Sequence, residues 1–137
     1  MIDTYVLDAC ALIALLKDEN GADKVVEVYQ KVNSDEAVII INKVNLLEIY
    51  YGFYQDCGKE YAEKILDNIK RSIVTITDIS DNVFEEAGRL KATYRISLAD
   101  SVALAETSIS GGTLLTADHH ELDIVEQHEK MRFHWIR

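Results

Sequence analysis

The chain has 137 residues, of which 48% are hydrophobic, so it can bury the core of a folded domain and is not a disordered chain. No apolar run reaches the roughly 18 residues of a membrane span, and the amino terminus lacks the basic segment of a signal peptide, so we expect a cytoplasmic protein with no membrane contact. The net charge of -10 argues against a general nucleic-acid binder, because contacts to phosphate usually come from a basic surface.

The first half of the chain is predicted to alternate apolar strands with amphipathic helices. In chain order we expect a strand at 4–7, helices at 9–17 and around 25–32, a strand at 37–41, a helix from 44 to near 58, and a helix at 60–71. Asn42 is placed to cap the helix that follows the second strand.

The second half continues the alternation. We expect a strand at 73–76, a helix from 80 to 94, a helix from 97 to 110, a strand at 113–116, a short helical stretch, and a strand at 132–136. Ser97 resembles a helix cap, with Asp100 at the position where a capping box would place an acid. No linker or repeat divides residues 1–137, so we expect a single α/β domain with helices on both faces of a parallel sheet.

Four acidic residues are candidates for one site. Asp8 and Asp118 each follow a predicted strand end, Asp100 lies in the first turn of a helix, and Glu48 lies within an apolar helical stretch. Ligands of parallel sheets bind at the carboxyl ends of the strands. At a separation of about 5 Å, each pair of carboxylates would repel by roughly 3 kcal/mol, so we expect raised pKa values or a neutralising cation. Oxygen ligands alone favour Mg²⁺ or Mn²⁺.

Four segments of the sequence resemble, in order, the signature segments of PIN-domain nucleases. They are VLDACALIALL, NLLEIYYG, SLADSVALA and LLTADHHEL, and they extend over nearly the whole chain. The resemblance is closest to VapC-like ribonuclease toxins of toxin–antitoxin pairs. It implies a PIN-like three-layer α/β/α sandwich that hydrolyses RNA phosphodiester bonds with metal-activated water. It also implies a homodimer silenced by a cognate antitoxin.

The resemblance assigns roles to individual residues. Asp8, Glu48, Asp100 and Asp118 match the acidic quartet that binds metal, and Thr116 matches a hydroxyl position that supports the site. At position 10, where many relatives carry Ser or Thr, this chain has Cys10. A thiol is a weaker hydrogen-bond donor than a hydroxyl, so we expect this departure to alter the ordering of Asp8 or a substrate contact. Cys10 and Cys57 are both expected to be reduced, largely packed thiols.

Other residues have two interpretations that the sequence leaves open. Arg89, Lys91 and Arg95 form either a solvated helix face or a contact to the RNA backbone, and the chain's acidity makes such a contact more necessary. His119 and His120 are better explained as a surface pair than as ligands of Mg²⁺. A pairing of Cys10 with one of these histidines as a thiol nucleophile lacks support in the sequence.

The helix between Val44 and Tyr54 is rich in apolar residues and tyrosines. Tyr50, Tyr51 and Tyr54 are expected to pack in the core or at an interface, and stacking on RNA bases is the alternative. The same helix could offer a groove to an amphipathic helix of the antitoxin.

Two rival functions remain to be weighed. A receiver-type phosphoacceptor domain would need an acidic pair after the first strand and a lysine after a late strand, whereas here Asp8 stands alone and His119 follows Asp118. A PIN-like module that binds without catalysis would differ from the nuclease only in lacking metal-dependent cleavage.

Overall fold

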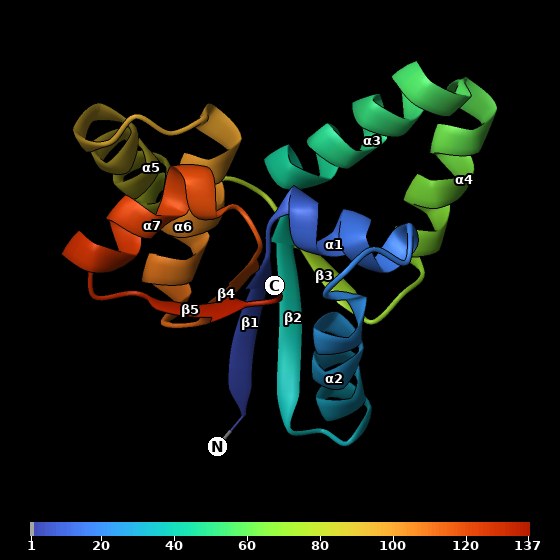
Figure 1. Cartoon of the computed structure of the whole chain (residues 1–137), viewed down its shortest axis with the longest axis horizontal. Helices are drawn as coiled ribbons and strands as arrows, with labels where there is room; N and C mark the ends of the chain where they lie inside the picture. Colours follow the sequence, from blue (N-terminus) through green and yellow to red (C-terminus); the bar gives the residue numbers. More distant parts are fainter. Residues whose placement is uncertain (1) are drawn as a thin grey trace.

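A five-stranded sheet forms the centre of the computed structural model, which describes residues 2–137 (Figure 1). All neighbouring strands pair in parallel, in the order β3-β2-β1-β4-β5. The strands are β1 (Asp3–Leu7), β2 (Ala37–Asn42), β3 (Val74–Thr77), β4 (Thr113–Thr116) and β5 (Arg132–Trp135). The helices are α1 (Ala9–Leu16), α2 (Ala22–Asn33), α3 (Lys43–Cys57), α4 (Lys59–Lys70), α5 (Asp81–Thr93), α6 (Leu98–Ser110) and α7 (His119–His128). The predicted α/β alternation is confirmed.

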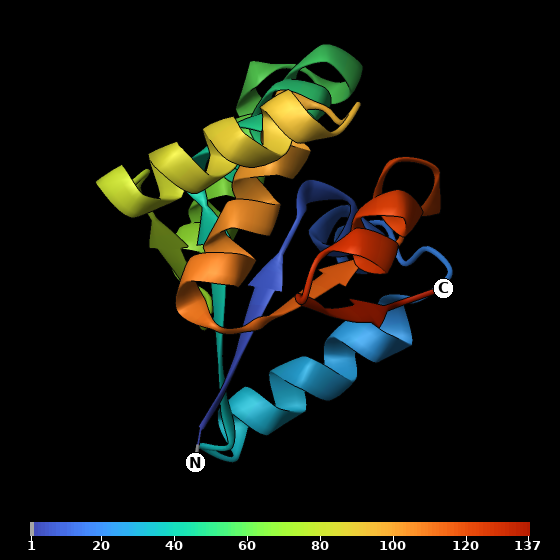
Figure 2. The same ribbon diagram turned by 90° about the vertical axis from the view of Figure 1, so that its left-hand side faces the viewer.

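Side chains that alternate along the buried strands divide the core into two layers. Leu7 and Ile41 pack with α1 to α4, whereas Val6 and Leu114 pack with α5 to α7 on the opposite face. Figures 1 and 2 show these two groups of helices on either side of the sheet. The predicted three-layer sandwich is therefore confirmed, because both faces of the sheet are buried.

Local capping signals set the start of the helices that border the site. The Asn42 side chain accepts a hydrogen bond from the Val44 amide at 3.0 Å, as predicted. Ser97 caps α6 in the same way through the Asp100 amide, at 3.1 Å. Gly111 ends α6 in the left-handed conformation, with φ of 69°, which glycine adopts without steric cost.

The order of the strands creates a crevice beside β1. From β1 the chain proceeds through β2 to β3 on one side, and then crosses to β4 and β5 on the other side. At such a switch point the connections diverge beyond the carboxyl ends of the strands, where parallel sheets bind their ligands. Residues 8 and 118 follow the strands β1 and β4 that border this point. Within residues 2–137, no helix combines the length and apolar character needed to cross a membrane.

Candidate metal centre

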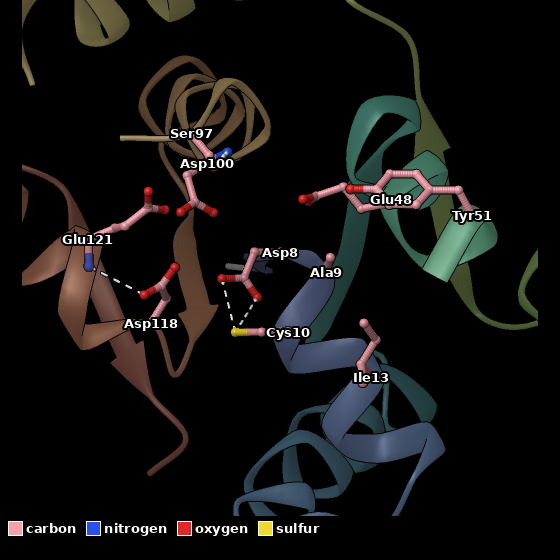
Figure 3. A pocket seen from close by; sticks show the side chains of 10 residues that line it. All are labelled: Asp8, Ala9, Cys10, Ile13, Glu48, Tyr51, Ser97, Asp100, Asp118 and Glu121. Carbon is pink, nitrogen blue, oxygen red and sulfur yellow. Dashed lines mark hydrogen bonds between the residues drawn. The ribbon is translucent and has the colours of Figure 1, made fainter. Parts of the chain in front are cut away.

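A pocket of about 450 Å³ lies where α1, α3, α6 and α7 meet beyond the strand ends. It is lined by Asp8, Ala9, Cys10, Ile13, Glu48, Tyr51, Ser97, Asp100, Asp118 and Glu121. Figure 3 shows four of the five carboxylates pointing toward one another, with the fifth, that of Glu48, facing them from α3. The structure therefore gathers all four acids that the sequence singled out.

Asp8 is held rigidly at the base of the pocket. It caps α1 by accepting a hydrogen bond from the Ala11 amide at 2.8 Å, and its exposed fraction is only 2%. Burial raises the pKa of Asp8, although contacts from the Thr116 hydroxyl and the Ala11 amide act in the opposite direction. The cap explains why this aspartate points into the crevice after β1 ends.

Asp100 forms a tight carboxylate cluster with Asp118 and Glu121, in which one oxygen of each lies within 4.8 Å of the others. Asp100 is buried, and its Oδ2 atom has no hydrogen-bond partner in the described residues. Burial, followed by contact with Glu121 and the charge of Asp8, raises the pKa of Asp100 to about 9. Contact with Asp100 in turn lowers the pKa of Glu121. The cluster thus favours a shared proton or a bound cation.

Glu121 was not among the residues predicted from the sequence. It lies in the first turn of α7, where its backbone amide donates to Asp118 Oδ1 at 3.3 Å. Contacts from Ser97 also help to lower its pKa, so Glu121 links the start of α7 to the start of α6. The available signal was the spacing of Asp118 and Glu121, because a cap residue and the residue three positions later face the same end of a helix.

Glu48 approaches the cluster from α3. Burial is the main reason that its pKa is raised, and the charge of Asp8 adds to this effect. The neighbouring Asn45 is fully buried, and its side chain donates to the Ala99 carbonyl of α6 at 3.0 Å. A hydrogen bond from Asn45 lowers the Glu48 pKa and partly offsets burial. The predicted cost of an acid in this apolar stretch is therefore offset only in part by a buried amide.

Cys10 and Thr116 lie against Asp8. The Cys10 thiol donates to Asp8 Oδ1 at 3.2 Å and accepts from the Ala117 amide at 3.3 Å. Burial and the charge of Asp8 raise the thiol pKa to about 12, which disfavours the thiolate that a nucleophile requires. The buried Thr116 hydroxyl accepts a hydrogen bond from the Asp118 amide at 3.1 Å. Both side chains thus help to hold Asp8 and Asp118 in place. The expectation that both thiols are packed is wrong for Cys57, which is exposed at the end of α3.

The donor set fits a hard divalent cation. Every converging side chain offers carboxylate oxygen, the ligand type that Mg²⁺ and Mn²⁺ prefer. A buried carboxylate oxygen without a partner is costly, and Asp100 Oδ2 is such an atom. A cation held between Asp100, Asp8 and their neighbours would satisfy it and remove their mutual repulsion.

The PIN domain family model matches residues 5–126, which is most of the chain. The chain belongs to the PIN domain family. The resemblance seen in the four sequence segments is thereby confirmed at the level of the family, and the five-stranded sandwich is a PIN fold. No curated protein matches the chain in sequence.

Solved structures of toxin–antitoxin proteins share this fold. VapBC2 from Rickettsia felis, bound to a promoter DNA fragment, is 18% identical, with a TM-score of 0.73 and coverage of 96% of this chain and 98% of that chain. VapBC from Salmonella typhimurium, also bound to DNA, is 14% identical, with a TM-score of 0.73 and full coverage of both chains. VapC20 from Mycobacterium tuberculosis, a toxin that cleaves the sarcin-ricin loop, is 16% identical, with a TM-score of 0.57 and coverage of 80% and 86%.

The basic residues predicted to contact RNA lie outside the pocket lining of this PIN domain. Arg89 is engaged in ion pairs with Glu86 and Glu129, each at 2.7 Å. Lys91 is exposed and borders a separate apolar groove, and Arg95 is exposed two residues before Ser97 of the pocket. Arg95 is thus the cation of this set that is nearest in sequence to the acid cluster.

The histidine pair does not contribute to the pocket lining of the PIN domain either. His119 stacks on Trp135 with ring centroids 3.8 Å apart, and its Nδ1 atom lies 2.8 Å from Asp123. His120 is exposed. These contacts agree with the expectation of a surface pair.

The tyrosines of α3 divide between packing and exposure. Tyr50 packs against the core, whereas Tyr51 and Tyr54 are about half exposed. Tyr51 also lines the acid pocket. The expected groove on this helix involves only its first turn: Val44 lines an apolar groove of about 460 Å³ with residues of α5 and α6, including Phe84 and Leu98.

Proposed function

We propose that this PIN domain is a metal-dependent ribonuclease that hydrolyses RNA phosphodiester bonds. The observation that carries the proposal is the convergence of carboxylates from α1, α3, α6 and α7 around the buried, unpartnered Oδ2 atom of Asp100. The mutual repulsion of these carboxylates is costly without a cation, and a cluster of this kind is explained if it binds one.

Asp8, Glu48, Asp100 and Asp118 are the proposed ligands of Mg²⁺ or Mn²⁺, and Glu121 joins them because of its place in the cluster. When bound, the cation supplies a more acidic water and neutralises charge that develops on the phosphodiester. The proposed hydrolysis has water as its nucleophile and forms no covalent enzyme intermediate, and the raised pKa of the Cys10 thiol argues against that side chain as a nucleophile.

RNA must be held against an unfavourable net charge of -10. We propose that Lys91 and Arg95 contact its backbone, because both are exposed and none of the ion pairs within residues 2–137 includes them. Tyr51 lines the pocket while half exposed, so its ring can stack on a base near the scissile bond.

The likeness to VapBC structures supports a role as the toxin of a toxin–antitoxin pair. The resemblance of the sequence to VapC-like toxins is our reason for proposing that the protein acts in the cytoplasm as a homodimer. The chemistry of the pocket suits inhibition by a cationic side chain. An arginine or lysine of an antitoxin would form charge-assisted hydrogen bonds with the carboxylates and compete with the metal. Growth arrest on expression of this chain, relieved by a co-expressed antitoxin, is the expected behaviour; unimpaired growth would overturn the toxin role.

Cleavage of single-stranded RNA by the purified protein tests the enzymatic proposal. We expect cleavage with Mg²⁺ or Mn²⁺, no cleavage in EDTA, and loss of at least about 100-fold in rate for Asp8→Asn, because a metal ligand is removed at nearly constant volume. Asp3→Asn, at an exposed position on the strand that Asp8 follows, serves as the control and should cleave normally. Full activity in EDTA would refute the proposal, and inactivity of the wild-type protein under all conditions would favour the binding-module alternative.

A further inference from the structure

A further buried acid, in addition to Asp8 and Asp100, lies outside the metal pocket, where α6 passes the carboxyl ends of β2 and β3. Glu106 of α6 is only 6% exposed. Its Oε1 atom accepts a hydrogen bond from Asn42 Nδ2 at 2.9 Å and another from the Thr77 hydroxyl. Within residues 2–137, none of the ion pairs includes Glu106. This carboxylate therefore serves two neutral donors, one from each strand end.

The Asn42 amide performs two tasks through its two ends. Its oxygen caps α3 by accepting from the Val44 amide, and its nitrogen donates to Glu106 and to the Asp78 carbonyl at 3.3 Å. An amide that rotated by half a turn would present its nitrogen to the helix start and lose the cap. Because Glu106 Oε1 accepts from the nitrogen end of the Asn42 amide, it favours the orientation in which the oxygen end caps α3.

The contact between Asn42 and Glu106 affects the metal pocket, because α3 and α6 each carry an acid that lines the pocket. Glu48 lies in the second turn of α3, and Asp100 lies in the first turn of α6. Asn42 contacts Glu106 on α6, and one turn later Asn45 contacts the Ala99 carbonyl at the start of the same helix. Two polar contacts at separated points fix both the spacing and the rotation of α3 against α6.

We propose that Glu106 is a positioning residue for the metal centre: by holding the Asn42 cap, it sets where α3 presents Glu48 opposite Asp100. This inference rests on the proposed function, in which both acids bind the cation. The acceptor oxygen is the property that matters. Glu106→Gln keeps an acceptor for Asn42 and Thr77. Glu106→Leu removes that acceptor at similar volume and leaves Asn42 with only the longer contact to the Asp78 carbonyl and Thr77 with only the longer contact to the Ile41 carbonyl.

Hydrogen exchange of the metal-free protein tests the positioning directly. In Glu106→Leu we expect the amides of residues 45–49 to exchange at least about 10-fold faster, while Glu106→Gln stays within about twofold of the wild type. Thr107→Val is the matched control, because Thr107 is the next residue on α6 and its buried hydroxyl bonds only the Ala103 carbonyl at 2.8 Å. The control should leave exchange at 45–49 unchanged.

Titration with Mn²⁺ alone provides the second readout. Loss of a supporting contact behind a ligand typically weakens metal binding 10–100-fold, so we expect at least about a 10-fold higher dissociation constant for Glu106→Leu and a wild-type value for Glu106→Gln and Thr107→Val. Should Glu106→Leu fail to fold, Asn42→Ser keeps a capping oxygen but loses the donor to Glu106, and it should show both effects.

The outcomes separate this inference from the proposed function. Wild-type protein that binds no Mn²⁺ would overturn the metal centre and the role of Glu106 in it, while the exchange data would still show whether Glu106 orders α3. If the wild type binds Mn²⁺ and Glu106→Leu matches Thr107→Val in both readouts, the positioning role is wrong and the metal centre stands. If Glu106→Gln is as impaired as Glu106→Leu, charge and not the acceptor is required, and the inference also fails.

Discussion

Asp100 is the residue that most destabilises the metal-free site. Burial and the neighbouring acids raise the pKa of the Asp100 carboxyl group to about 9, far above the unperturbed aspartate value of 3.8. The folded protein therefore binds this proton more tightly than the unfolded chain does. The stability that the bound proton contributes is complete below pH 3.8 and is lost as the pH rises toward 9.

Replacement of Asp100 by asparagine should therefore stabilise the protein without metal. Asp100→Asn removes the group that must stay protonated or repel its neighbours, so its melting temperature in EDTA should exceed the wild-type value by several degrees at pH 8. The difference should shrink at pH 5, closer to the pKa of the unfolded chain. Thermal unfolding followed by circular dichroism measures both, and a difference independent of pH would contradict the assigned cause.

The thiol of Cys10 should be unreactive, because burial and Asp8 raise its pKa to about 12. Iodoacetamide at pH 8 should modify the exposed Cys57 well before Cys10, as mass spectrometry of the peptides can show. Cys10→Ser should keep cleavage within a few-fold of the wild type, because a hydroxyl can donate the same hydrogen bond to Asp8. Loss of activity in Cys10→Ser, with folding and metal binding intact, would reopen the nucleophile hypothesis.

At this scale the sequence allowed a part of the site to be predicted. Asp8, Glu48, Asp100 and Asp118 stand in recognisable segments, and the structure brings them into one pocket. Glu106 could not be predicted, because an acid in an apolar helix shows its role only when α6 is placed against the ends of β2 and β3. The ion pair between Arg89 and Glu129 could not be predicted either, because Glu129 lies 40 residues further along the chain.

At the scale of elements, the helices and strands follow local signals closely. The caps predicted at Asn42 and Ser97 are present, because the hydrogen bonds that define a cap involve residues two or three positions away. The place of β4 beside β1 depends instead on packing across the whole sheet. The expectation that Asp8 and Asp118 meet therefore required an assumption about strand order, which the parallel pairing of β1 and β4 confirms.

A contact between elements changes the interpretation of Arg89 as an RNA-binding residue. Its ion pair with Glu129 joins α5 to the segment after α7, so Arg89→Ala should lower the melting temperature by a few degrees. RNA affinity and its salt dependence should stay close to wild type in that variant. Lys91→Ala combined with Arg95→Ala should instead weaken binding and flatten the salt dependence, with stability unchanged.

Binding of labelled RNA at several salt concentrations, in the inactive Asp8→Asn background, measures this separation. An unchanged salt slope in the Lys91 and Arg95 double variant would place the RNA-binding surface elsewhere. A large loss of affinity in Arg89→Ala at unchanged stability would restore Arg89 to the binding surface.

At the scale of the whole molecule, the fold and the charge distribution both determine the properties of the acidic pocket. The switch point beside β1 brings together helices from both layers, and each contributes an acid to the same pocket. An overall charge of -10 leaves this pocket with little long-range attraction for RNA. In the proposed function, a cation in the pocket would both stabilise the fold locally and offset the repulsion of a polyanionic substrate.

Calorimetric titration of the metal-free protein with Mn²⁺ tests this account most directly. We predict saturable binding to the wild type and to the exposed control Asp3→Asn, with binding weakened at least about 10-fold in Asp8→Asn and Asp100→Asn. The apparent affinity should rise from pH 6 to pH 8, because the cation must displace the protons that the raised pKa values of Asp8 and Asp100 retain. Equal binding by all four proteins, or no binding by the wild type, would contradict the assignment of these carboxylates as a metal centre.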